Sequence, residues 1–549
     1  MGKSIEQKKR ISVDWKDSVT WRTPVALFLV YMITVAGISF MNAGNSYEQA
    51  YSFRLFCIGY GVLVLMLMDW RKYVTFWSLG YLPLCYIFMH YAYLNHWIPD
   101  TCEYKFVDII RYGKLTVLIW GIVLIALLRD LFLHFESYRV VAKRKVLALL
   151  WGVFAALLTI FNPGYYYAVF FAVCFTALFL VLADPQSRDI FKKALVYGLY
   201  LSFLFVTYKS LRHRPYDTER YLAYFGNTNT GGTYFAVVIS VIFSVISGTQ
   251  RAKLKKGCKM ALLAVHYVFL SVAIGFAVFN YTRTTIAGML FAFAVLFVVS
   301  LLWEKKKKQV LLRYGIGLIV CALMIYPCFL AFRYIPAYAN APTFFSGEYN
   351  PEVRVIQNDP VDSPKYTSME SFLTLALGKW GIYVTFNTKE DEGEGEAVVI
   401  DTERDVTNGR VEIWQAYLSR CGIKGHYPGH IELDSGYFVY HAHNTYIHVM
   451  YQYGLLTGIA FGLMVLGSFI ASLFTYRAKA VKHPEMGAYV LISGICLVSM
   501  VTEWMWHPAY VICCTFCACY GLLLYEDNSR KSTKKSGEKR VGKKQTKRK

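Results

Sequence analysis

The sequence predicts an all-α polytopic integral membrane protein, and two features of its composition lead to this fold class. Of its 549 residues, 56% are hydrophobic and only 17% are charged, whereas a soluble domain carries about 25% charged residues. Apolar runs of roughly 20 residues recur between residues 24 and 525, and each is long enough to cross about 30 Å of hydrocarbon. Such long continuous runs exclude an outer-membrane barrel, whose strands are short and alternate in polarity.

We expect about 14 transmembrane helices, within a range of about 12 to 14. They are predicted near residues 24–42, 51–69, 74–93, 107–128, 146–161, 165–183, 194–209, 231–248, 261–279, 284–302, 312–332, 442–475, 487–503 and 507–525. The stretch 442–475 is longer than one span needs. It is therefore either one long helix or an interfacial turn followed by a span.

The basic residues indicate the orientation of the chain in the membrane. A net charge of +22 would suit a nucleic-acid-binding protein, but the positive charge is concentrated between predicted spans and in the tail. The clusters are Arg71-Lys72, Arg139–Lys145, Arg251–Lys259, Lys305–Lys308 and residues 527–549. Since basic loops face the cytoplasm, we expect both termini in the cytoplasm, a tail drawn to anionic membrane lipids, and no nucleic-acid partner.

These assignments divide the chain into five parts. They are a cytoplasmic N-terminus (1–23), an N-terminal helix bundle (24–332), a large extracytoplasmic loop (333–439), C-terminal membrane helices (440–526) and a basic cytoplasmic tail (527–549). A loop of this length is more than a passive connector. Its apolar spacing predicts amphipathic helices at Ser368–Val384 and Val411–Cys421.

Several charged side chains are expected at the outer face, near the helix ends. They are Arg220, Arg283, Arg410, His441 and His443. Guanidinium groups keep their charge and match phosphate oxygens, so three arginines at one face indicate an anionic ligand such as a diphosphate. A histidine titrates near neutral pH and can remove a proton from a hydroxyl.

Each of these residues also has an ordinary structural interpretation. Arg283 can extend to lipid head groups, and Arg410 can be a surface cation. Either histidine can make a single structural hydrogen bond. Asn444 can cap the helix that follows it, and Gly454 can serve helix packing. The functional interpretation therefore depends on the residues taken together.

Four short motifs follow one another along the chain. Arg220 precedes the aromatic-Gly-Asn-x-Asn turn Phe225-Gly226-Asn227-Thr228-Asn229. Thr282-Arg283-Thr284 lies at the start of a predicted helix, at its outer end. Gly409-Arg410 with Trp414 forms G-R-x-x-x-W, and His443, Asn444, Gly454 and Thr457 form H-[NSQ]-x9-G-x-x-[GTY]. With these four motifs, the chain resembles the O-antigen ligase and O-antigen polymerase superfamily of bacterial envelope glycosyltransferases. Thr228 departs from the usual proline of the Gly-Asn-Pro-Asn turn.

The resemblance implies a GT-C-like architecture and a specific reaction. A glycan on a polyprenyl (undecaprenyl) diphosphate carrier would pass to an acceptor hydroxyl at the outer face of the cytoplasmic membrane, with inversion and without metal or cofactor. Arg220, Arg410 and Arg283 would bind the diphosphate, and His443 would be the general base. Supporting roles fall to Asn444, His441, Trp414 and Gly454, where Trp414 either stacks on sugar rings or belongs to the interfacial aromatic belt.

Alternative functions remain open at this point. An O-antigen or capsule repeat-unit polymerase belongs to the same superfamily and adds the glycan to another lipid-linked repeat, whereas a ligase uses a glycan, lipid or protein acceptor. A transporter or flippase of lipid-linked saccharides would use the same arginines for binding. It would also need charged groups along a path through the bilayer, and few charged residues lie deep in the predicted spans.

Overall fold

The structure is a computed structural model that describes residues 15–43, 46–68, 83, 87, 106–133, 144–164, 166–213, 221–344, 369, 372–373, 376, 410–433, 436, 438–479, 486–503 and 505–526. The helices are α1 (Trp15–Asn42), α2 (Ser46–Leu67), α4 (Phe106–Leu133), α6 (Lys145–Ile160), α7 (Tyr166–Val181), α8 (Pro185–His213), α9 (Thr228–Arg251), α10 (Lys256–Asn280), α11 (Arg283–Trp303), α12 (Lys307–Phe344), α14 (Arg410–Ser419), α15 (Thr445–Tyr453), α16 (Leu455–Lys479), α17 (Met486–Ser499) and α18 (Val511–Leu524). The described strands, β1 (Ile431–Glu432) and β2 (Phe438–Val439), pair antiparallel.

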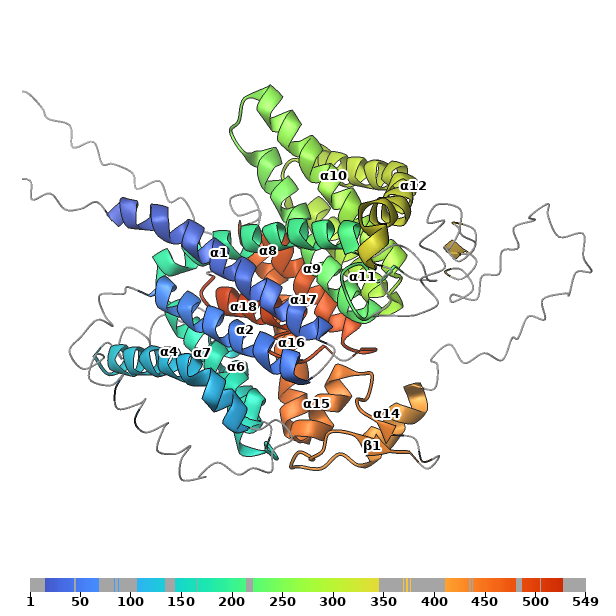
Figure 1. The fold of residues 1–549 in the computed structure, drawn as a ribbon. Helices are drawn as coiled ribbons and strands as arrows, with labels where there is room; N and C mark the ends of the chain where they lie inside the picture. Colours follow the sequence, from blue (N-terminus) through green and yellow to red (C-terminus); the bar gives the residue numbers. More distant parts are fainter. Residues whose placement is uncertain are drawn as a thin grey trace, which may run out of the picture.

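The all-α membrane fold predicted from the sequence agrees with this helical bundle (Figure 1). Eight helices within the described ranges are long and apolar enough to cross a membrane: α1, α2, α8, α9, α10, α11, α12 and α16. Shorter apolar helices lie within α4, α6, α7, α17 and α18. Most of the predicted span 74–93, most of the loop 333–439 and the tail 527–549 lie outside the described residues.

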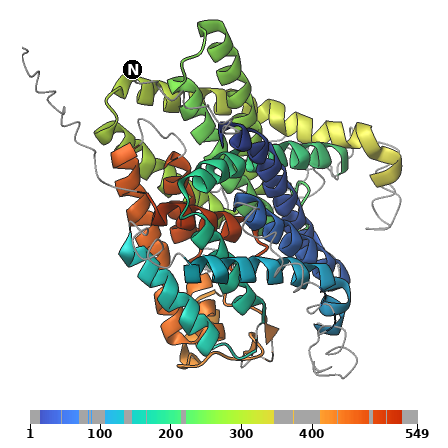
Figure 2. The same ribbon diagram turned by 90° about the vertical axis from the view of Figure 1, so that its left-hand side faces the viewer.

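The bundle is arranged around α9. In its most apolar stretch 89% of residues are buried, compared with 22% in α12. Helices α8, α10, α17 and α18 all pack against α9, and the last part of α12, yellow in Figure 2, projects from the side of the bundle. Outward-facing leucines such as Leu290, Leu318 and Leu323 are more than 60% exposed, which is the pattern of a surface solvated by lipid rather than by water.

A small lobe formed by α14, β1, β2 and α15 lies at one end of the bundle (Figure 1). It has its own apolar core, in which Tyr417 is fully buried. The Tyr417 hydroxyl donates to the carbonyl oxygen of Val439 at 2.8 Å and so ties α14 to the hairpin. The helix predicted at Val411–Cys421 is thus confirmed as α14, and it packs on α15.

The stretch 442–475 is divided into two helices. α15 ends at Tyr453, Gly454 lies between the helices, and α16 starts at Leu455. Gly454 has a φ of +98°, and a Cβ added there would lie 2.2 Å from the carbonyl oxygen of Ile423. The backbone of the 420–433 segment therefore reaches the turn so closely that only glycine fits. A single long helix, one of the two forms expected, is ruled out.

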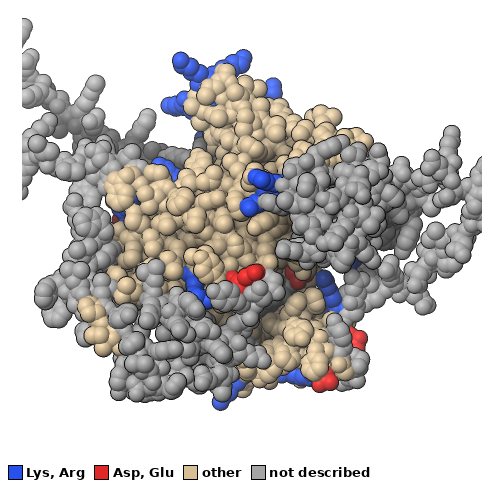
Figure 3. Space-filling model, in the orientation of Figure 1, with Lys and Arg blue, Asp and Glu red and all other residues tan. Residues whose placement is uncertain are grey.

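The opposite end of the bundle is fixed by a buried carboxylate, Glu304, and we call it the Glu304 end. Arg313 and Arg251 approach the two carboxylate oxygens at 2.8 Å each, and the Tyr476 hydroxyl donates to one of them at 2.5 Å. These contacts join α9, α12 and α16 to the residue that follows α11. Lysine and arginine side chains gather at the top of Figure 3, over the beginning of α10 at this same end.

Replacing Glu304 by alanine is expected to destabilise the protein by about 3–5 kcal/mol, because two largely buried guanidinium groups would lose their counter-charge. Thermal denaturation in detergent micelles measures the effect. Glu412→Ala, which removes an exposed carboxylate on α14, is the matched control. A melting temperature of Glu304→Ala equal to that of the control would show that the network contributes nothing.

Candidate functional site

His443 lies in the short loop that leads from β2 into α15. Its backbone is left-handed, with a φ of +48°, and Asn444 follows as the N-cap of α15. The Asn444 side-chain oxygen accepts a hydrogen bond from the backbone N–H of Ile447 at 3.1 Å, which confirms the capping role considered from the sequence. The imidazole of His443 therefore projects from a fixed point just before the helix.

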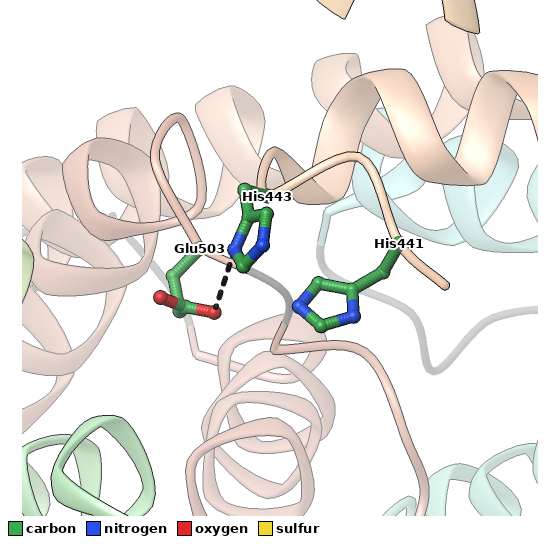
Figure 4. A group of neighbouring side chains, drawn as sticks. All are labelled: His441, His443 and Glu503. Carbon is green, nitrogen blue, oxygen red and sulfur yellow. Dashed lines mark ion pairs between the residues drawn. The ribbon is translucent and has the colours of Figure 1, made fainter. Parts of the chain in front are cut away.

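Glu503 faces His443 from the loop between α17 and α18 (Figure 4). Its Oε1 lies 3.8 Å from Nδ1 of His443, and the two side chains are 6% and 32% exposed, respectively. Nδ1 of His443 is buried and has no hydrogen-bond partner within the described part of the chain. A carboxylate and an imidazole thus face each other at slightly more than hydrogen-bonding distance.

Two further side chains approach the other oxygen of Glu503. The Asn229 amide donates to Oε2 at 2.6 Å, and an Arg410 guanidinium nitrogen lies 3.9 Å from the same oxygen. Asn229 comes from the first turn of α9 and Arg410 from the first residue of α14. Glu503 therefore brings together Asn229, Arg410 and His443, which belong to three of the four motifs found in the sequence.

The starts of three helices meet at this point, which we call the Glu503 end. The Thr282 hydroxyl, before α11, donates to the carbonyl oxygen of Thr228 in α9 at 2.9 Å. Thr445 of α15 donates its hydroxyl to the carbonyl oxygen of Glu503 at 2.5 Å and its N–H to that of Met500 at 2.8 Å. Helix N-termini carry partial positive charge, which favours the Glu503 carboxylate at this position.

Two other histidines pack beside His443, and burial keeps both of them neutral. The rings of His441 and His443 are 4.2 Å apart between centroids. Burial, followed by repulsion from His443, lowers the pKa of His441 to about 4, although Glu503 opposes the change. Burial also lowers the pKa of His448 to about 3. Nδ1 of His448 accepts the N–H of Ala442 at 3.3 Å, which holds the loop that carries His443.

The remaining residues predicted for the site occupy different positions. Arg283 is the first residue of α11. The next residue, Thr284, accepts a hydrogen bond from Thr502 at 3.1 Å, so Arg283 starts its helix beside the loop of Glu503. Trp414 lies on α14 with a buried indole nitrogen that has no partner among the described residues. Arg220 lies outside the described residues.

His441, His443 and Glu503 also form a group that could hold a metal ion, since their possible ligand atoms all lie within 4.8 Å of one another. Two imidazoles and one carboxylate match the ligand types of zinc sites. Ligand atoms around zinc lie about 3.3 Å apart, because each bond is about 2 Å long, so the group would have to contract. The guanidinium of Arg410 beside the same carboxylate opposes a cation.

The sequence motifs do not predict Glu503 or His448 as site residues. Asn229 belongs to the Phe225–Asn229 turn, and nothing in that motif indicates that it contacts a carboxylate. Glu503 lies 60 residues beyond His443 in an apolar segment, at the end of a predicted span, and no motif includes it. A carboxylate at the end of an apolar run was the available signal, because such a position is costly for a charge.

No protein-family model, curated protein or solved structure matches this chain.

Gly454→Ala is expected to destabilise the protein by more than about 1 kcal/mol. The new Cβ would clash with the carbonyl oxygen of Ile423, and the positive φ of this residue is unfavourable for alanine. Gly152→Ala in α6 is the matched control, since a Cβ there meets nothing within 4 Å. Thermal denaturation of both variants measures the difference in their stability. Equal melting temperatures would contradict the close approach at Gly454.

Proposed function

We propose that the protein is an O-antigen ligase-like glycosyltransferase, which moves a glycan from a polyprenyl diphosphate to an acceptor hydroxyl at the membrane surface. The observation that carries this proposal is the position of His443 at the joined starts of α9, α11 and α15, beside Arg410. A base and an anion-attracting surface are thus adjacent, as the transfer requires. The four motifs described above support the same superfamily.

The diphosphate would bind at the Glu503 end. Helix N-termini supply partial positive charge, and Arg283 and Arg410 begin two of the helices there. We propose that Arg220 binds the diphosphate together with these two arginines. These groups suit a leaving group whose negative charge grows in the transition state.

His443 would remove the proton from the acceptor hydroxyl. The acceptor oxygen forms a bond to the anomeric carbon while the bond from that carbon to the carrier phosphate breaks, and the polyprenyl diphosphate leaves with the bonding electrons. Direct displacement inverts the anomeric configuration. The partial exposure of His443 suits this role, because an acceptor sugar can reach the imidazole from outside the bundle.

The charge distribution supports an extracytoplasmic site. The basic clusters 251–259 and 305–308 follow α9 and α11 at the Glu304 end, whereas the Glu503 end lies at the other ends of the same helices. By the positive-inside rule, the Glu304 end faces the cytoplasm. We accordingly propose both termini inside, about 12 to 14 spans and a GT-C-like arrangement, in which α15 is a short helix at the outer surface.

His443→Ala is expected to abolish glycan transfer while expression and membrane insertion stay at wild-type levels, because the acceptor hydroxyl would lose the imidazole that takes its proton. Mass spectrometry of lipid-linked glycans in cells measures the effect. Full-length chains retained on the carrier would indicate a ligase, and single repeats would indicate a polymerase. His430→Ala, which changes another histidine of the small lobe, is the control. Normal transfer in His443→Ala would refute the proposal.

Transfer by the purified enzyme is expected to continue in EDTA and to gain nothing from added Mg²⁺ or Mn²⁺, because arginines and helix N-termini can neutralise the leaving diphosphate. Initial rates with and without chelator test this expectation. Loss of activity in EDTA and its recovery with metal would show that a cation takes the place assigned to the arginines.

A further inference from the structure

We propose that Glu503 is the positioning residue of His443, and that Asn229 in turn orients Glu503. The carboxylate would accept the Nδ1–H of His443, so that Nε2 carries the lone pair that takes the acceptor proton. This inference rests on the proposed function, because it assigns His443 the role of the base.

The geometry fits one tautomer of His443. Its Nδ1 is buried without a hydrogen-bond partner among the described residues, and Glu503 Oε1 lies 3.8 Å away. A charge-assisted hydrogen bond is about 2.8 Å long, so a closure of about 1 Å completes it. A neutral imidazole with its proton on Nδ1 accepts protons at Nε2. The carboxylate therefore selects the nitrogen that does the chemistry.

The carboxylate itself is held on two sides. The Asn229 amide donates to Oε2 at 2.6 Å, whereas Oε1 is the oxygen that faces His443. The Glu503 carbonyl oxygen accepts the hydroxyl of Thr445 at 2.5 Å, and that hydroxyl accepts the N–H of Met505 at 3.0 Å. Thr445 lies two residues after His443, so Glu503 and His443 are fixed relative to each other through the first turn of α15.

The groups around His443 are two neutral histidines, one cation and one carboxylate. His441 lies beside it and His448 beneath the loop, and both are kept neutral by burial. Arg410 is a cation 3.9 Å from Glu503 Oε2. Among the described residues that face His443, Glu503 supplies the negative charge. When His443 takes a proton at Nε2, the carboxylate of Glu503 stabilises the positive charge that forms.

The contacts of Oε2 also favour positioning over metal binding. An amide donor and a guanidinium both approach this oxygen, and both would be repelled by a cation bound there. A metal ion would also occupy the nitrogen of His443 that faces Glu503. Metal ligation is therefore the competing role that the experiment must separate from positioning.

The main variant is Glu503→Gln, which keeps the shape of the side chain and removes its charge. We expect initial rates of glycan transfer to fall about a hundredfold, as is usual when a general base loses its support. Asn229→Ala, which keeps the charge but releases the carboxylate, should lower the rate about tenfold. Glu412→Gln, which removes an exposed charge on α14, should leave the rate unchanged.

A second measurement does not depend on activity. Diethyl pyrocarbonate modifies only unprotonated imidazole, and tandem mass spectrometry of the peptide reports His443 separately from His441 and His448. At alkaline pH, where imidazoles are unprotonated, the rate at which His443 is modified should fall severalfold in Glu503→Gln, because the carboxylate no longer keeps the proton on Nδ1 and the lone pair on Nε2. In Glu412→Gln the modification rate should stay at the wild-type value.

The outcomes separate the two proposals. If the wild-type protein transfers no glycan but the modification rate of His443 falls in Glu503→Gln, the proposed function fails and the coupling of Glu503 to His443 stands. If the wild type is active and Glu503→Gln keeps both its transfer rate and its modification rate, the positioning role is wrong. Stoichiometric Zn²⁺ bound by the wild type and lost in Glu503→Gln would also overturn it, because the carboxylate would then be a ligand.

Discussion

The buried carboxylate of Glu503 is the constraint on which the arrangement of this end of the protein depends. A carboxylate that is only 6% exposed costs several kcal/mol to desolvate unless nearby groups compensate it. Compensation comes from separate elements: Asn229 of α9, Arg410 of α14 and His443 before α15. Helices that are distant in the sequence must therefore meet around one charge.

The two buried carboxylates, Glu304 and Glu503, differ in how closely their partners approach them. Glu304 has guanidinium nitrogens at 2.8 Å from both of its oxygens, and these short contacts leave its charge fully used within the protein. At Glu503 the guanidinium of Arg410 and the imidazole of His443 lie at 3.9 and 3.8 Å. The longer distances leave Arg410 and His443 available for another partner. A buried glutamate therefore holds the helices together at the Glu304 end, whereas at the Glu503 end the side chains around the glutamate can still contact a ligand.

Local sequence predicted the helices well because lipid imposes a length and a composition on each span. The runs near 231–248, 261–279 and 284–302 lie within α9, α10 and α11. The sequence also indicated His443, as a titratable group at the start of an apolar run, and Arg410, through its motif in the large loop. It did not indicate the pairing of His443 with Glu503, because that pairing depends on how α9, α15 and the loop after α17 pack together. The spacing of residues along the chain does not predict how these elements pack together.

The backbone at the Glu503 end explains how these groups keep their positions. Tyr281 and His443 both have left-handed backbones, with φ of +51° and +48°, and each is followed by an N-cap residue and then a helix, α11 or α15. Such a conformation costs a residue other than glycine about 1–2 kcal/mol, and it persists only where the surroundings enforce it. Both helices thus begin after a left-handed residue, and this local strain fixes where α11 and α15 start. Under the proposed function, that strain is the cost of holding His443 in place before any ligand arrives.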